Sequence, residues 1–226
     1  MRYEPMAIRT HLISPGEDLV QVVRRYTEDV ADPGDVVALS ESMVAIAQGR
    51  AILPQSVHPR PLARLLRRFA HPDGSLATPA AMELAIREAG LGRILLAGAA
   101  AALARVFGVR GVFYRVAGHG LQFIDDIGGT LAPFDRYIVL GPRHAQEVAR
   151  RIKEAIGLDV LIVDVNDLGC VDLVAATGPP DPAPLVEALR RNPQGNDDEQ
   201  TPIVVLKRLP ARQEPRVSAP RAGRSP

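Results

Sequence analysis

Two groups of acidic residues follow apolar segments of the chain. The first group, Asp125 and Asp126, comes directly after "LQFI". The second lies in "VLIVDVNDLG", where Asp164, Asn166 and Asp167 end a run rich in valine. Carboxylate and amide oxygens suit a hard divalent cation such as Mg²⁺ or Mn²⁺, and such an ion can bridge the phosphates of a nucleotide. The same residue types also cap helices and form turns, so a purely structural role is the competing hypothesis.

The segments around these acids alternate between helix and strand, as is typical of an α/β fold. Residues 143–157, "RHAQEVARRIKEAIG", predict an amphipathic helix that stops at Gly157. The stretch "VLIVDVNDLG" that follows, residues 160–169, predicts a strand. In folds of this class, ligand-binding side chains are expected at the carboxyl ends of strands, which is where Asp164 lies.

The rest of the chain predicts further helices and strands. Thr78 precedes Pro79, the arrangement of an N-cap followed by proline at the first helical position. The alanine-rich segment 92–108 predicts a buried helix, and residues 111–120 predict a strand that enters a glycine-rich loop. The apolar segment "PIVVLKRL", residues 202–209, predicts a final strand.

Composition and charge argue against several classes of protein. The 226 residues are 46% hydrophobic and carry a net charge of +1, values of an ordinary globular protein without a strong field toward nucleic acid or membrane. Apolar runs are too short to span a bilayer. With one cysteine and no apolar signal segment in "MRYEPMAIRT", we expect a cytoplasmic protein. Residues 210–226, rich in proline and arginine, predict a disordered basic tail after a domain over residues 1–209.

Several common catalytic motifs are absent from the sequence. It contains neither a G-x-x-x-x-G-K-[ST] phosphate loop nor a G-x-S-x-G nucleophile elbow. "GHGLQF" begins like a dinucleotide-binding motif, but Phe123 occupies the place of the third glycine. The histidines lie far apart and include no i, i+4 pair for zinc: His11, His58, His71, His119 and His144. The carboxylates that follow the apolar segments are therefore the remaining candidates for functional residues.

Three stretches, read together, resemble one known family. They are "AIRTHLISPGEDL", "DPGDVVALSESMVAIAQGR" and "GLDVLIVDVNDLG", in this order. They are similar to the segments G-(L/I)-P-x-I-x-x-G-D-D-L, DGDVLVV(T/C)SK(I/V)VSKAEGR and ITDTNGR of the GTP-dependent coenzyme F420-0:γ-glutamyl ligase family. The last strand also resembles that family's "GDGIPAVVVRGL". The resemblance implies an α/β fold with a mixed sheet and packed helices, and with a reduced second subdomain because the chain is short after Gly169.

The resemblance also implies an activity. Members of the family bind GTP together with divalent metal ions and add L-glutamate by γ-linkage to coenzyme F420-0, a deazaflavin precursor. They form homodimers. We therefore expect Mg²⁺ or Mn²⁺, GTP as a co-substrate, a small-molecule acid as substrate and a homodimeric assembly, with neither nucleic acid nor a membrane as partner.

The family's site residues carry over onto individual positions of this chain. The acid of the family's "AGID" segment matches Asp125, and the first acid of "TDTN" matches Asp164, so the resemblance implies that these two are metal ligands. It further implies a nucleotide-binding set that comes from the first turn and from the two later motifs: His11, Leu12, Ile13, Ser42, Arg50 and Asn166.

The match departs from the family at positions where the family carries positive charge. The two motif lysines fall on Ser42 and Ile46. A lysine beside GTP neutralises charge that develops in phosphoryl transfer, and losing one such contact costs about 3 kcal/mol, roughly a hundredfold in rate. No catalytic residue is therefore assigned. Two functions stay open: a GTP- and metal-dependent ligase acting on F420-0 or a related acid, and a non-catalytic nucleotide- or metal-binding homologue with a regulatory or structural role.

Overall fold

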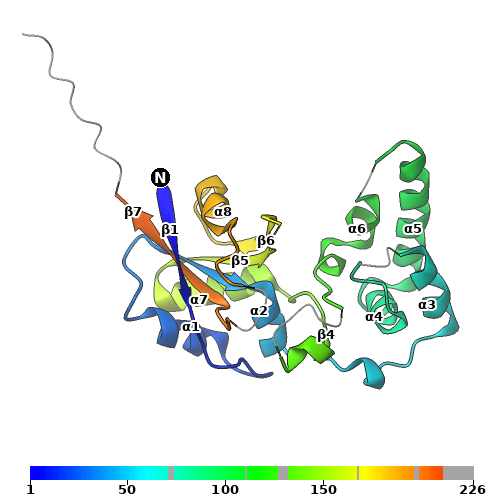
Figure 1. Cartoon of the computed structure of the whole chain (residues 1–226), viewed down its shortest axis with the longest axis horizontal. Coiled ribbons are helices and arrows are strands. Elements are labelled where there is room, and N and C mark those ends of the chain that lie inside the picture. Colours follow the sequence, from blue (N-terminus) through cyan, green and yellow to red (C-terminus); the bar gives the residue numbers. More distant parts are fainter. Residues whose placement is uncertain (71–73, 110, 127–131, 167, 196–198, 211–226) are drawn as a thin grey trace, which may run out of the picture.

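The chain folds into a sheet with packed helices and a mostly helical part that stands beside it (Figure 1). This architecture comes from a computed structural model. It describes residues 1–70, 74–109, 111–126, 132–166, 168–195 and 199–210. The basic tail expected over residues 210–226 therefore lies, apart from Pro210, outside the described residues.

The main sheet is mixed, as the resemblance implies. Its strands lie in the order β1-β7-β2-β5-β6. The central strands β2 (Val36–Ser40) and β5 (Asp159–Val165) run parallel to each other. The other strands are antiparallel to their neighbours: β1 (Arg2–Ile8), β6 (Val171–Ala176) and β7 (Ile203–Leu209). The α/β class is confirmed, as are the strand predicted over 202–209 and the strand predicted in the stretch 160–169, which ends at Val165.

The two parallel strands are buried on both faces. Successive side chains of a strand point to opposite sides, and helices cover both sides here. One face packs against α1 (Leu19–Thr27), α2 (Glu41–Ala47) and α7 (Ala145–Ile156) through Val37, Leu39, Val160 and Ile162. The other face packs against α8 (Ala183–Leu189) through Val36, Ala38, Leu161 and Val163. Burial on both sides explains why "VLIV" is continuously apolar rather than alternating.

The helical part encloses a second hydrophobic core. It consists of α3 (Pro61–Leu66), α4 (Pro79–Ala89), α5 (Leu91–Val106), α6 (Val112–Ala117) and a small sheet of β3 (Ala51–Ile52) with β4 (Ile138–Val139). Short 3₁₀ helices cover Pro54–Ser56, Arg67–Phe69, His119–Leu121 and Phe134–Arg136. The predicted cap of α4 is confirmed, since Thr78 Oγ1 accepts a hydrogen bond from the Ala81 N–H at 3.1 Å.

The strand predicted over residues 111–120 is wrong, because residues 112–117 form helix α6. The prediction relied on the β-propensity of "VFYRV", which is a weak preference that tertiary packing overrides. In the structure Phe113 and Tyr114 are partly buried and pack against the second core. The short helix after Gly111 places both side chains against that core.

Helix α5 is not the buried helix that its composition predicts. Ile94 and Ala97 are buried, whereas Leu96, Leu103 and Phe107 are 63%, 66% and 75% exposed. The reason is its place at the outer edge of the helical part, where it packs against α4 and α6 (Figure 1). Among the described residues no single helix is long and apolar enough to cross a membrane, and α4 with α5 meets that criterion only as a pair bent by 109°.

Leu185 tests the packing of α8 on the sheet. Its side chain is fully buried, so Leu185→Ala is expected to lower the free energy of unfolding by about 2–5 kcal/mol through lost burial and a residual cavity. Chemical denaturation measures this difference. The matched control is Leu168→Ala, at a side chain that is 94% exposed, for which a change within about 0.5 kcal/mol is expected. Equal effects at the two leucines would contradict the packing.

Candidate functional site

The parallel pairing of β2 with β5 brings two acids to one edge of the sheet. Ser40, the last residue of β2, pairs with Val163 of β5. Glu41 follows Ser40 and Asp164 follows Val163, so both acids lie at the carboxyl ends of neighbouring parallel strands. This is the edge at which ligand sites of α/β proteins are found.

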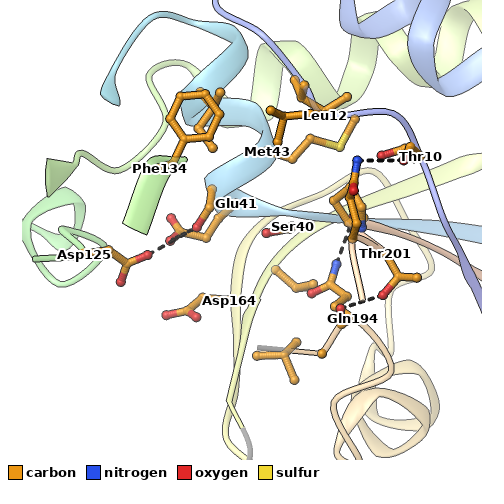
Figure 2. Close-up of a pocket in the computed structure, with 18 of the residues that line it drawn as sticks. Thr10, Leu12, Ser40, Glu41, Met43, Asp125, Phe134, Asp164, Gln194 and Thr201 are labelled. Carbon is orange, nitrogen blue, oxygen red and sulfur yellow. Dashed lines mark hydrogen bonds between the residues drawn. The ribbon is translucent and has the colours of Figure 1, made fainter. Parts of the chain in front are cut away.

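A cavity of about 400 Å³ lies at this edge. Its size falls within the range of about 300–1,000 Å³ that is usual for small-molecule sites. The lining comes from segments far apart in the sequence, chiefly 10–13, 40–43, 163–166 and 200–202, with single residues from elsewhere such as Asp125, Phe134 and Gln194 (Figure 2).

Three carboxyl groups face this cavity, those of Glu41, Asp125 and Asp164 (Figure 2). The Ser42 Oγ lies 3.4 Å from Glu41 Oε1 and 3.3 Å from Asp125 Oδ2, so a single hydroxyl proton stands between two carboxylates. Within the described structure the buried Glu41 Oε2 has no hydrogen-bond partner. No three His, Cys, Asp or Glu side chains of the described residues are arranged, as they stand, to hold a metal ion.

All three acids of the cavity have raised pKa values. Burial raises the pKa of Asp125 to about 7; the charge of Asp164 adds to this shift and the hydrogen bond from Ser42 opposes it. Burial also raises the pKa of Glu41 well above its usual range, and the charges of Asp125 and Asp164 raise it further. The pKa of Asp164 is raised by burial and by Asp172, its cross-strand partner on β6. Each raised pKa means that the carboxyl group loses its proton less readily in the cavity than in water.

The adjacent acids Asp125 and Asp126 point to different parts of the molecule. The main chain of Asp125 pairs with Val139 of β4 through two hydrogen bonds of 2.8 and 2.9 Å, which fixes Asp125 at the cavity. Asp126 instead accepts hydrogen bonds from the Thr78 N–H and hydroxyl, both at 3.2 Å, and so holds the start of α4. Of this pair, the one that lines the cavity is Asp125, the acid that the resemblance selects.

Asn166 lines the cavity and also closes the turn between β5 and β6. Its Oδ1 accepts hydrogen bonds from the main-chain N–H groups of Leu168 at 3.0 Å and Cys170 at 3.1 Å. The structural role that the sequence leaves open for this residue is therefore present. Asp167, the acid beside it, lies outside the described residues.

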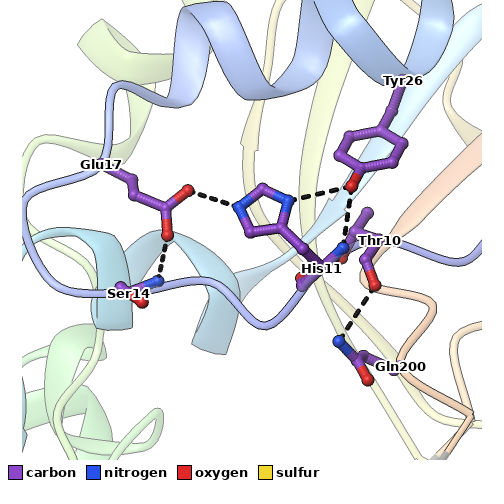
Figure 3. A network of polar contacts seen from close by, with 6 residues as sticks. All are labelled: Thr10, His11, Ser14, Glu17, Tyr26 and Gln200. Carbon is purple, nitrogen blue, oxygen red and sulfur yellow. Dashed lines mark hydrogen bonds and ion pairs between the residues drawn. The ribbon is translucent and has the colours of Figure 1, made fainter.

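The predicted residues His11, Leu12 and Ile13 all line the cavity. Figure 3 shows how the segment is held: His11 Nε2 lies 2.7 Å from Glu17, and His11 Nδ1 lies 2.9 Å from the Tyr26 hydroxyl, which also accepts the His11 N–H. Burial raises the pKa of Glu17, but the hydrogen bonds from His11 and Ser14 outweigh it and lower this pKa overall. These contacts fix the segment of residues 11–13, the first turn of the chain, before any ligand binds.

Of the remaining predicted residues, Ser42 lines the cavity and Arg50 does not. The Arg50 side chain is buried; its Nε donates to the Gly141 carbonyl at 2.6 Å and its Nη2 to Glu88 of α4 at 2.8 Å. Glu88 also accepts from Arg143 at 2.8 Å. These contacts join the helical part to the segment before α7, and the structure does not bring Arg50 together with the other predicted nucleotide-binding residues.

Sequence reasoning missed Glu41, the most buried acid of the cavity. The available signal was an acid placed directly after the apolar strand "VVALS", the same arrangement that drew attention to Asp125 and Asp164. It also missed Gln194 and Thr201, which come from the loop before β7 and reach the cavity only through the fold.

The fold and this cavity define an α/β protein with an acidic binding site at the carboxyl ends of two parallel strands. The family model described as F420-0:Gamma-glutamyl ligase matches residues 7–167, and the chain belongs to this family. The chain is also 27% identical over 172 residues to the "Coenzyme F420:L-glutamate ligase" of Methanopyrus kandleri. That alignment covers 75% of this chain and 60% of the relative, so the chain spans less than two thirds of the relative's length.

The raised pKa of Asp125 predicts that the metal-free protein becomes less stable as the pH rises. Its pKa is higher in the folded state than its ordinary 3.8, so the stabilisation is complete below about pH 4 and is lost as the pH rises through about 7. Between about pH 8 and pH 6, thermal unfolding in a chelator should show the wild type gaining about 1 kcal/mol more than Asp125→Asn. Parallel pH profiles for the two proteins would contradict the shift.

Proposed function

We propose that this chain is a GTP- and divalent-metal-dependent ligase that adds L-glutamate by γ-linkage to coenzyme F420-0 or to a related acid. Family membership supports the reaction class, and the Methanopyrus kandleri relative carries the activity in its name. The observation that carries the proposal is the acidic cavity, in which the two predicted metal ligands, Asp125 and Asp164, face the same space (Figure 2).

The charge of the cavity supports dependence on a metal. The described lining residues include three carboxylates and neither lysine nor arginine. The phosphates of GTP are anionic, so direct contact with these carboxylates is repulsive. Oxygen donors of this kind are those that Mg²⁺ and Mn²⁺ prefer, and the buried Glu41 Oε2 has no other partner among the described residues. The residues therefore fit a divalent cation, which Asp125 and Asp164 would hold.

The proposed chemistry has two steps. A carboxylate oxygen of the acid substrate attacks the γ-phosphorus of GTP, and GDP leaves. The amine of glutamate then attacks the acyl phosphate, inorganic phosphate leaves, and the amine loses a proton. A bound divalent cation would neutralise the phosphate charge. His11, fixed by Glu17 and Tyr26, and Ser42 would border the nucleotide.

One observation favours a second candidate function. The positions of the family's two motif lysines are occupied by Ser42 and by Ile46, whose side chain is buried, so neither supplies a positive charge. A site without these charges binds a nucleotide through its metal but stabilises phosphoryl transfer less. The alternative is therefore a non-catalytic nucleotide- or metal-binding homologue with a regulatory or structural role.

Calorimetry and a turnover assay separate the two functions. GTP is expected to bind only with Mn²⁺ or Mg²⁺ present, and Asp164→Asn should weaken this binding at least about tenfold, whereas the matched control Asp172→Asn should not. With F420-0, glutamate and GTP, mass spectrometry should detect a product extended by glutamate. GTP binding without product would favour the non-catalytic homologue, and no GTP binding at millimolar concentration would overturn the ligase.

We also propose a cytoplasmic homodimer that forms through the exposed face of α5. Leu96, Leu103 and Phe107 follow at helical spacing and are exposed, with Leu95 and Val106 beside them. A contiguous apolar face of this kind on one helix is typical of a protein–protein contact. Helix α5 lies at the outer edge of the helical part (Figure 1), and none of these five residues lines the cavity, so pairing through them leaves the cavity open.

The double variant Leu96→Glu, Leu103→Glu tests this contact. It places two like charges in the proposed interface and should shift the mass in sedimentation analysis from dimer to monomer. The control Leu168→Glu puts a charge on an exposed leucine outside this face and should leave the dimer intact. A monomeric wild type at micromolar concentration would rule the dimer out.

A further inference from the structure

We infer that Glu41 is a third ligand of a divalent cation, and that the cavity binds this ion without any nucleotide. The inference rests on the proposed function in so far as Asp125 and Asp164 hold the same ion. It goes beyond the family's pattern, because the motif SK(I/V)VSKAEGR, aligned back from Arg50, has serine at the position of Glu41.

The first argument is the environment of the Glu41 carboxylate. Glu41 is 3% exposed, and within the described structure its Oε2 has no hydrogen-bond partner. A buried carboxylate oxygen without a partner is energetically costly, and folded proteins rarely keep one without a bound ion or water to satisfy it. Its other oxygen has the 3.4 Å contact with the Ser42 hydroxyl, which cannot serve both Glu41 and Asp125 with one proton.

The second argument is that the backbone holds Glu41 in place. The Ser40 N–H donates to the Pro202 carbonyl at 2.8 Å, and Ser40 is the last residue of the central strand β2. Every residue of α2 from Met43 to Ala47 is buried. Glu41 therefore cannot relieve its burial by moving to the surface, and its charge has to be compensated in place, by a proton or by a cation bound in the cavity.

The third argument is the position of the two aspartates. Both line the same cavity as Glu41, and the three carboxyl groups face one another in Figure 2. Asp125 is fixed by the pairing of its main chain with β4, whereas Asp164 is partly exposed near the end of β5. As they stand the three do not form a closed ligand set, so a bound ion must draw them together, chiefly by rotation of the Asp164 side chain.

Titration of the metal-free protein with MnCl₂, followed by calorimetry in the absence of nucleotide, tests the inference. The wild type should bind Mn²⁺, and Glu41→Gln should bind it at least about tenfold more weakly. Glu41→Ser, which restores the family's residue, should show the same loss and guards against a folding defect of one variant. The matched control is Asp172→Asn, which removes an exposed acid next to Asp164 that does not line the cavity and should change the affinity less than about threefold.

Thermal unfolding supplies an independent readout. Without metal, Glu41→Gln should be as stable as the wild type or more stable, because it removes an uncompensated buried carboxylate. With Mn²⁺, the wild type should gain more than the variant, since a ligand stabilises the state that it binds. Equal Mn²⁺ affinity and equal gain in both proteins, or no Mn²⁺ binding to the wild type at millimolar concentration, would overturn the inference. Glu41-dependent Mn²⁺ binding without GTP binding would leave it standing while the proposed function fails.

Discussion

The parallel pairing of β2 with β5 is the constraint on which the rest of the structure depends. Parallel strands need cover on both faces, and the chain supplies it with α1, α2 and α7 on one side and α8 on the other. The pairing also fixes which residues leave the sheet at the same edge. Because Ser40 is in register with Val163, Glu41 and Asp164 both lie at this edge, and the segment with His11 lines the same cavity.

The helical part contributes to this edge from outside the main sheet. Its small strands β3 and β4 position Asp125, and the buried Arg50 links α4 to the segment before α7 through Glu88 and Gly141. An arginine that closes a motif in the sequence thus acts here on the arrangement of the two parts. Three separate features of the structure assemble the acidic cavity. They are the register of β2 with β5, the bridge between Asp125 and Val139, and the contacts that hold His11.

The sequence predicted the α/β class, the strands β5 and β7 and the acids Asp125 and Asp164 because those signals are local. An apolar run and a following acid can be recognised without knowing the fold. The residues of the sequence alone could not distinguish Asp125 from Asp126, since the contacts that separate them come from the fold: Asp125 pairs with Val139, and Asp126 accepts hydrogen bonds from Thr78. It failed for α6 and for the exposure of α5, because both depend on which neighbours a segment finds. Glu41 escaped notice because acids at the start of a helix are commonly exposed, and its burial becomes visible only in the folded chain.

The opposite directions of Asp125 and Asp126 have a mechanical consequence. One acid lines the cavity and the next accepts hydrogen bonds from Thr78, the N-cap of α4, so a single peptide bond joins the two places. A shift of the chain by one residue would present the wrong acid to each partner. The anchoring of α4 and the position of a cavity carboxylate are therefore set by the same dipeptide.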